Sequence, residues 1–189
     1  MDNQLRIPPI AHSQWNEEVR SVLASFSVPF SKYGLNGDES EKDKLSPILS
    51  TVLQSPDLAK AYFPLADYLL RQSSLTPRFT RIVILRVAWR WQFEVEWKQH
   101  AFMAVRDGIL TQQEVDSLAG KVLADHWDDR ECLLIIAVDQ IFKTSNIEEE
   151  TWNGLTQFLD KKQLVDLTFT IGGYVLAGLY MNVFHIPAG

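Results

Sequence analysis

Two residues of opposite acid–base character lie four positions apart in the apolar stretch FEVEWKQHAFMAV, namely Glu96 and His100. Side chains at positions i and i+4 of a helix share one face, so this carboxylate and this imidazole can contact each other. Helical spacing places Phe93 and Trp97 around them, on a face that we expect to be at least partly buried. Glu96 and His100 therefore form an acid–base pair, and the chemistry that such a pair offers is proton transfer.

The preceding helix carries a third candidate, Arg81. The segment Pro77–Trp91 is apolar nearly all round, which is typical of a central helix packed on several sides. Arg81 and Arg86 interrupt this pattern, and each must reach the surface, pair with a carboxylate or point into a pocket. A structural interpretation stays open as well. Glu96 and His100 can simply tie one helix to its neighbour, and Arg81 can close a salt bridge, with Glu96 as one possible partner.

The composition limits the setting of this chemistry. With 189 residues, 46% of them apolar, the chain is expected to form one domain over residues 1–189. The 24 acidic and 18 basic residues give a net charge of −6, which favours solubility and argues against a nucleic-acid partner. A single cysteine, Cys132, allows neither an intrachain disulfide nor a cysteine pair for zinc or redox chemistry, and this predicts a cytoplasmic location.

Helix signals dominate the sequence, and almost no segment alternates with period two, so we predict an all-α fold. Thr76 before Pro77 and the segment Thr111–Glu114 are helix starts, and Gly108 is a helix end. Pro64 is expected to kink or divide its helix. The expected helices are His12–Phe26, Pro47–Leu53, Pro56–Leu70, Pro77–Trp91, Phe93–Asp107, Gln112–Leu123, Asp128–Thr144, Glu148–Leu159 and Asp160–Phe184.

The remaining segments carry smaller expectations. The N-terminal arm lacks the order of a secretory signal, and the polar segment Ser31–Lys44 is predicted to be a mobile loop. The apolar stretch Phe169–Phe184 is about 16 residues long, short of the roughly 20 that a membrane span needs, so we predict a buried or subunit-facing helix and no membrane partner. Gly172, Gly173 and Gly178 weaken that helix, which predicts close contact with another helix, within or between subunits.

Several short motifs lie between Leu45 and Gly120: Pro77-Arg78, Ile84-Leu85-Arg86-Val87-Ala88, Glu96-Trp97-x-x-His100, Gly108 and Glu114-Val115. In these motifs the chain resembles the carboxymuconolactone decarboxylase family, within the alkylhydroperoxidase D-like superfamily. The resemblance covers residues 45–120, with an N-terminal arm, first helix and loop over 1–44 and C-terminal helices over 121–189. It implies a helical domain of about eight to nine helices, a homo-oligomer between dimer and hexamer, and a site near the helix that carries His100.

The redox motif of that superfamily is absent from the sequence. Its redox members use a Cys-x-x-Cys pair, a histidine four residues after the second cysteine and a glutamate one helix earlier. Counted back from His100, the cysteine positions hold Glu96 and Phe93, and the glutamate position holds Arg81. A disulfide-cycling peroxidase needs an attacking thiolate and a resolving thiol. The chain therefore resembles a branch of the superfamily without the Cys-x-x-Cys motif.

The decarboxylase branch implies a different reaction, the cofactor-free loss of CO₂ from a small lactone acid. The enolate-like species that remains must be stabilised and protonated, which is work for a general acid. In this chain His100 is the candidate acid, Glu96 orients its ring, and Arg81 could bind a substrate carboxylate. Phe93 and Trp97 would line the site. The sequence thus predicts a cofactor-independent enzyme of lyase or isomerase type that acts on a small carboxylated or carbonyl compound.

Two other functions remain open at this point. One is a peroxidase or antioxidant activity like that of the redox members, and the other is a helical oligomer that binds a ligand without turning it over. We expect no cofactor and no metal, because Glu96 and His100 lack a third ligand at a recognisable spacing. The cluster around His126, Asp125 to Asp129, is interpreted as helix capping. The expected partners are a small-molecule substrate and further copies of the chain.

Overall fold

The computed structural model describes residues 5–24, 47–120 and 127–187. The predicted loop Ser31–Lys44 and the residue His126 lie outside these ranges. The chain forms two compact units. One consists of Met1–Asp67 with Val183–Pro187, and the other of Tyr68–Asn182 with Ala188–Gly189. That residues 1–189 form one domain stays a prediction.

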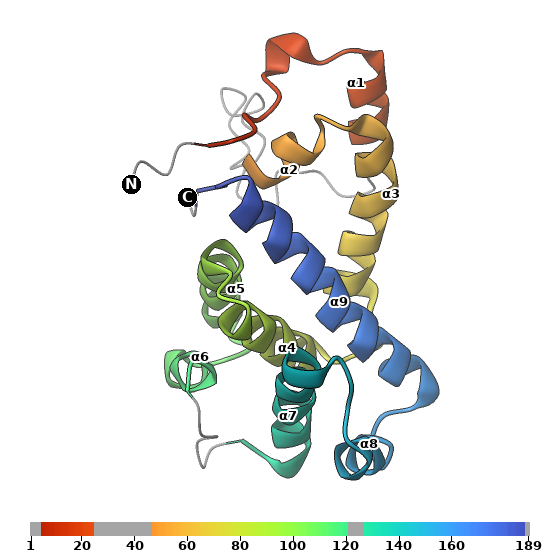
Figure 1. Cartoon of the computed structure of the whole chain (residues 1–189), viewed down its shortest axis with the longest axis vertical. Coiled ribbons are helices and arrows are strands. Elements are labelled where there is room, and N and C mark those ends of the chain that lie inside the picture. The colour runs from red at the N-terminus through yellow and green to blue at the C-terminus, as the bar shows by residue number, and fades with distance from the viewer. Residues whose placement is uncertain (1–4, 25–46, 121–126, 188–189) are drawn as a thin grey trace. The chain divides into compact units, whose positions relative to one another are not determined.

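The described residues form helices and no strand (Figure 1), which confirms the all-α prediction. The helices of the first unit are η1 (His12–Gln14), α1 (Glu17–Ala24), α2 (Pro47–Val52) and α3 (Pro56–Asp67). The second unit contains η4 (Tyr68–Gln72), α4 (Pro77–Arg90), α5 (Glu94–Arg106), α6 (Gln112–Leu118), α7 (Asp129–Thr144) and α8 (Glu149–Leu155). The last helix is α9 (Lys161–Val183).

In the first unit, α3 packs against α1 and α2. The buried side chains of this unit include Val22, Leu53 and Phe63. The C-terminal segment joins this unit through the backbone, because the Arg6 N–H donates to the Phe184 carbonyl at 3.0 Å. All of the predicted site residues lie in the second unit.

Local signals in the sequence set several of the helix ends. The Thr76 hydroxyl accepts from the Phe79 N–H at 3.2 Å and caps α4, with Pro77 in the first turn. Thr111 and Glu114 form the predicted capping box of α6. Gly108 follows α5 with a φ of 67°, in the left-handed region that glycine adopts without strain. These predictions are confirmed.

Three predicted boundaries were wrong. The segment expected to be helical from His12 contains a short 3₁₀ turn, and α1 begins only at Glu17, where the Asn16 side chain accepts from the Val19 N–H at 2.9 Å. Helix α6 ends at Leu118 rather than Leu123, because the Gly120 N–H turns back to the Ser117 carbonyl at 3.1 Å. Helix α8 ends at Leu155 rather than at the predicted Leu159.

Helix α3 continues through Pro64 as far as Asp67 and is not divided there. A π-helical turn, η4, follows from Tyr68 to Gln72, and the Ser73 N–H donates to the Tyr68 carbonyl at 2.8 Å. A missing proline N–H removes one hydrogen bond without forcing the chain out of the helix when neighbouring residues stay helical.

Helix α4 is the central element of the second unit, as predicted. Its side chains Ile82, Val83, Ile84, Leu85 and Val87 are fully buried. It packs against α5, α6 and α7, and Figure 1 shows α5 and α7 beside it. The candidate residue Arg81 lies on this helix, and Glu96 and His100 lie on the adjacent α5.

Helix α9 packs closely on this unit at two of its three glycines. A Cβ atom added at Gly173 would clash with Leu69 Cδ1, and one added at Gly178 would clash with Phe93 Cδ2. Close contact was predicted for all three glycines and is confirmed at Gly173 and Gly178, and at Gly172 it stays a prediction. By length and composition α9 could also cross a membrane, although 44% of its most apolar window is buried in the structure. The absence of a membrane partner stays a prediction.

Candidate functional site

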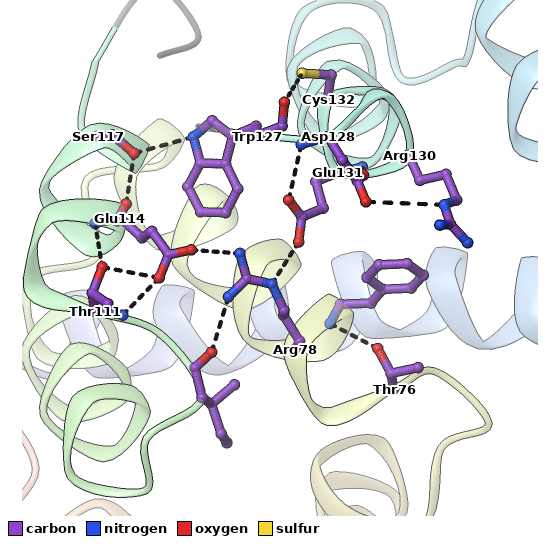
Figure 2. A network of polar contacts seen from close by, with 12 residues as sticks. Thr76, Arg78, Thr111, Glu114, Ser117, Trp127, Asp128, Arg130, Glu131 and Cys132 are labelled. Carbon is purple, nitrogen blue, oxygen red and sulfur yellow. Dashed lines mark hydrogen bonds and ion pairs between the residues drawn. The ribbon is translucent and has the colours of Figure 1, made fainter. Parts of the chain in front are cut away.

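The arginine of the Pro77-Arg78 motif holds three helices together (Figure 2). Arg78 on α4 donates through Nη2 to Glu114 Oε1 on α6 and through Nε to Glu131 Oε1 on α7, each at 2.5 Å. Its Nη1 also donates to the Ile109 carbonyl at 3.1 Å. Burial would raise the pKa of Glu114, but hydrogen bonds from Arg78 and Thr111 lower it to about 2. Arg78 and Glu114 therefore have a structural role.

The arginine of the Ile84–Ala88 motif is also structural. Arg86 is 2% exposed and donates to both carboxylate oxygens of Asp139 on α7, through Nε at 2.7 Å and through Nη2 at 2.6 Å. Its Nη1 donates to the carbonyls of Leu118 and Gly120 at 2.7 Å each. Arg86 thus fixes α4 against α7 and the end of α6, and it does not point into a pocket.

Another arginine of α4, Arg81, contacts the acid–base pair. Arg81 Nη1 lies 2.6 Å from His100 Nδ1, and His100 Nε2 lies 3.0 Å from Glu96 Oε2. The exposed fractions are 8% for Arg81, 5% for His100 and 3% for Glu96. The imidazole therefore lies between a guanidinium and a carboxylate inside the unit. Arg81 and Glu96 each bond to the imidazole, which separates them.

The hydrogen-bond partners determine where the imidazole carries its proton. A guanidinium only donates, so His100 Nδ1 must accept from Arg81. The ring proton then lies on Nε2 and is donated to the Glu96 carboxylate. A second proton on Nδ1 would break the bond to Arg81 and place two cations in contact. The resting state is thus a neutral imidazole with the Nε2–H tautomer.

This assignment predicts an NMR result. Long-range ¹H–¹⁵N spectra are expected to show His100 as the neutral Nε2–H tautomer at neutral pH, with an unprotonated Nδ1. In Arg81→Met, which removes the donor to Nδ1, the ¹⁵N signal of His100 Nδ1 is expected to shift more than that of Nε2. A His100 ring that carries its proton on Nδ1 in the wild type would contradict the assignment.

A fourth residue, Tyr174, lies at this site and was not predicted from the sequence. The rings of His100 and Tyr174, on α9, lie 5.1 Å apart and meet edge to face at 84°. Burial lowers the pKa of Arg81, and the nearby Arg106 acts in the same direction, whereas Tyr174 and Asp107 oppose the shift. Tyr174 lies within an apolar helix that reads as core, so only the structure brings it to His100.

The two predicted aromatic residues have other contacts. Phe93 is 2% exposed, belongs to the larger core cluster and packs against Gly178. Trp97 is partly buried, and its ring lies 6.0 Å from that of Trp89. Among the described residues, no ring contact or hydrogen bond joins either of them to His100. Their role in substrate binding stays a prediction, as does the catalytic role of His100 and Glu96.

Comparison with solved structures reveals the relatives of this fold. An alkylhydroperoxidase AhpD core protein from Ralstonia eutropha, described as peroxidase-related, matches with a TM-score of 0.75 at 13% identity, over 97% of this chain and 92% of that chain. The fold is that of the alkylhydroperoxidase D-like proteins. No protein-family model and no curated protein matches the sequence.

Other proteins with the alkylhydroperoxidase D-like fold differ in description. A protein of unknown function from Agrobacterium tumefaciens, related in its description to the antioxidant defence protein AhpD, matches with a TM-score of 0.67 at 20% identity, over 73% of this chain and 94% of that chain. The apo debrominase Bmp8 matches with a TM-score of 0.76 at 11% identity, over 98% of this chain and 93% of that chain. The shared fold therefore hosts more than one described activity.

Within this alkylhydroperoxidase D-like fold, the chain offers poor conditions for thiol chemistry. Burial raises the pKa of the Cys132 thiol, and the carboxylates of Asp129, Asp128 and Glu131 raise it further. A reactive thiol needs the opposite shift. In the described part of the chain, no group of three metal-ligating side chains lies close enough together to hold a metal ion.

Proposed function

We propose that this protein is a cofactor-independent acid–base enzyme, of decarboxylase or isomerase type, that acts in the cytoplasm on a small carboxylated or carbonyl compound. One observation carries the proposal: a buried imidazole is held between a buried guanidinium and a buried carboxylate. The Glu96 carboxylate can stabilise an imidazolium, and Arg81 can attract an anion. Proton transfer and anion binding are thus available at one place.

Arg81 is the proposed receptor for the substrate anion. Among the described residues its one polar contact is His100 Nδ1, and a guanidinium has five N–H donors. Burial disfavours its charged form, and Tyr174 and Asp107 offset only part of this shift, so a bound carboxylate or enolate oxygen would offset the rest. A planar carboxylate also fits two parallel N–H donors.

Anion binding at Arg81 would change the state of His100. When the guanidinium turns to the substrate, Nδ1 loses its donor and becomes free to accept a proton, while Glu96 holds the Nε2–H. In a decarboxylation, Nδ1 takes a proton from water and gives it to the carbanion that remains when the C–C bond to CO₂ breaks. In an isomerisation, Nδ1 takes a proton from one carbon and returns it to another.

The test is a screen of small β-oxo acids and unsaturated lactone acids, with CO₂ release and isomerisation followed by ¹³C NMR. For any compound that is turned over, His100→Ala is expected to lower kcat by a factor of about 10² to 10⁴. Arg81→Lys keeps the positive charge but loses the two parallel N–H donors of the guanidinium, and it is expected to raise KM. Lys98→Ala, an exposed site on the same helix, is the control. Unchanged turnover in His100→Ala would refute the proposal.

A second candidate function rests on the burial of the ring. Both nitrogens of His100 have partners and only 5% of the residue is exposed, which favours a non-catalytic oligomer with a structural Arg81–His100–Glu96 chain. Carboxylate titrations separate the candidates. A carboxylate that shifts the His100 ¹⁵N signals without turnover would indicate ligand binding.

A peroxidase would instead show thiol-dependent peroxide consumption that disappears in Cys132→Ser.

A further inference from the structure

Helix α9 exposes a stripe of large apolar side chains, which we call the α9 stripe. Its members are Val165, Phe169, Leu176 and Leu179, with exposed fractions of 55%, 58%, 51% and 47%. Counted from Val165, they follow at i+4, i+11 and i+14, the spacing that keeps residues on one face of a helix in contact with another helix. Large apolar side chains that are exposed on one face of a helix are typical of an interaction site.

A glycine lies at the centre of the stripe. Gly172 follows Val165 at i+7 and is exposed, and a Cβ atom added there would meet nothing within 4 Å. A glycine inside a helix costs about 1 kcal/mol relative to alanine. The chain itself explains Gly173 and Gly178 through Leu69 and Phe93, but it gives Gly172 no such neighbour. The bare backbone at Gly172 would let a helix from another molecule approach closely.

The α9 stripe is nearly symmetric about this glycine. Val165 and Leu179 lie seven residues before and after Gly172, and Phe169 and Leu176 lie three before and four after it. A two-fold axis through Gly172 would thus pair apolar side chains with apolar side chains along two antiparallel helices. An isologous contact requires such self-complementarity. No charged residue follows Asp166 in the helix, and Asp166 itself is buried.

We propose that the occupant of the α9 stripe is the α9 of a second copy of this chain, packed antiparallel across a two-fold axis near Gly172. A helix of 23 residues is about 34 Å long, which gives the pair a long line of contact. The opposite face of the same helix carries Tyr174, so the pairing braces the element that positions this ring against His100.

The first test measures the mass of the full chain in solution by analytical ultracentrifugation. The wild type is expected to be a dimer or a larger even-numbered assembly. Leu176→Glu is expected to weaken association by about 30-fold or more with an unchanged circular dichroism spectrum. Phe102→Glu, an equally polar change at a side chain 66% exposed on α5, is the control and should leave the mass unchanged. A monomer, an odd-numbered assembly or an assembly unaffected by Leu176→Glu would overturn the proposal.

The second test fixes the direction of pairing in a Cys132→Ser background. Oxidation of a mixture of Phe169→Cys and Leu176→Cys chains is expected to give the mixed disulfide faster than either self-pair, and Gly172→Cys is expected to link with itself. Faster self-linking at Phe169→Cys would indicate parallel helices and overturn the register.

If the α9 stripe bound a lipid surface instead, the chain would be a monomer that pellets with phosphatidylcholine vesicles. This outcome would also overturn the proposal.

Discussion

Replacing Arg86 by methionine is expected to lower the free energy of unfolding by about 3–5 kcal/mol, the cost of breaking a buried ion pair from one side. The guanidinium is 2% exposed and donates to both oxygens of Asp139 and to the carbonyls of Leu118 and Gly120. Methionine fills a similar volume but donates to none of these four acceptors. The loss is measured by urea unfolding followed by circular dichroism.

Arg90 provides the matched control for this change. It donates to the same carboxylate, Asp139 Oδ1, at 2.6 Å, but its side chain is 30% exposed. Solvent screens such a pair, so Arg90→Met is expected to cost about 0–1 kcal/mol. Equal losses in the two variants would show that burial does not decide the strength of these bonds. Both variants keep Arg81, and their effect on the candidate site is therefore indirect.

The helices of the fold could largely be predicted from the sequence because their signals are local. The Thr76 cap, the Thr111–Glu114 capping box and Gly108 each act within a few residues. The all-round apolar pattern of α4 predicted its central position. Boundaries that depend on weaker turns, such as the end of α6 at Leu118, were not visible in the periodicity.

The candidate site could be predicted only in part. The contact between Glu96 and His100 follows from the spacing of i and i+4 on one helix, and it is present. The partner of Arg81 depends on how α4 packs against α5, and the sequence left a carboxylate, the surface and a pocket open. The structure gives a different partner, His100 Nδ1. Tyr174 comes from α9, and no local pattern connects it to the site.

A second buried polar cluster, around Asp166 on α9, was also not predicted, because its contacts join residues far apart in the sequence. This carboxylate, 4% exposed, accepts from the Tyr68 hydroxyl at 3.0 Å, from the Ser74 N–H and hydroxyl at 2.6 Å each, and from Lys162 Nζ at 3.1 Å. Burial would raise the pKa of Asp166, but these hydrogen bonds lower it to about 2. In the unfolded chain the pKa of an aspartate is about 3.9.

Asp166→Asn is therefore expected to lower the free energy of unfolding at pH 7 by about 2–3 kcal/mol. The amide is neutral, and its NH₂ group faces donors in place of an acceptor. Because the folded state lowers the pKa, the stabilisation is fully present above about pH 4 and is lost as the pH falls through 2. The difference between wild type and Asp166→Asn should shrink over that range.

Urea unfolding of both proteins at a series of pH values measures this difference directly. Glu114, whose pKa is also about 2, titrates in both proteins, so its contribution cancels in the comparison. The exposed residue Asp116 gives the control, since Asp116→Asn is expected to change stability by less than about 0.5 kcal/mol at any pH. A difference for Asp166→Asn that stays constant down to pH 2 would mean that the charge of Asp166 does not stabilise the fold. The stabilisation would then come from the hydrogen bonds of Asp166 and not from its negative charge.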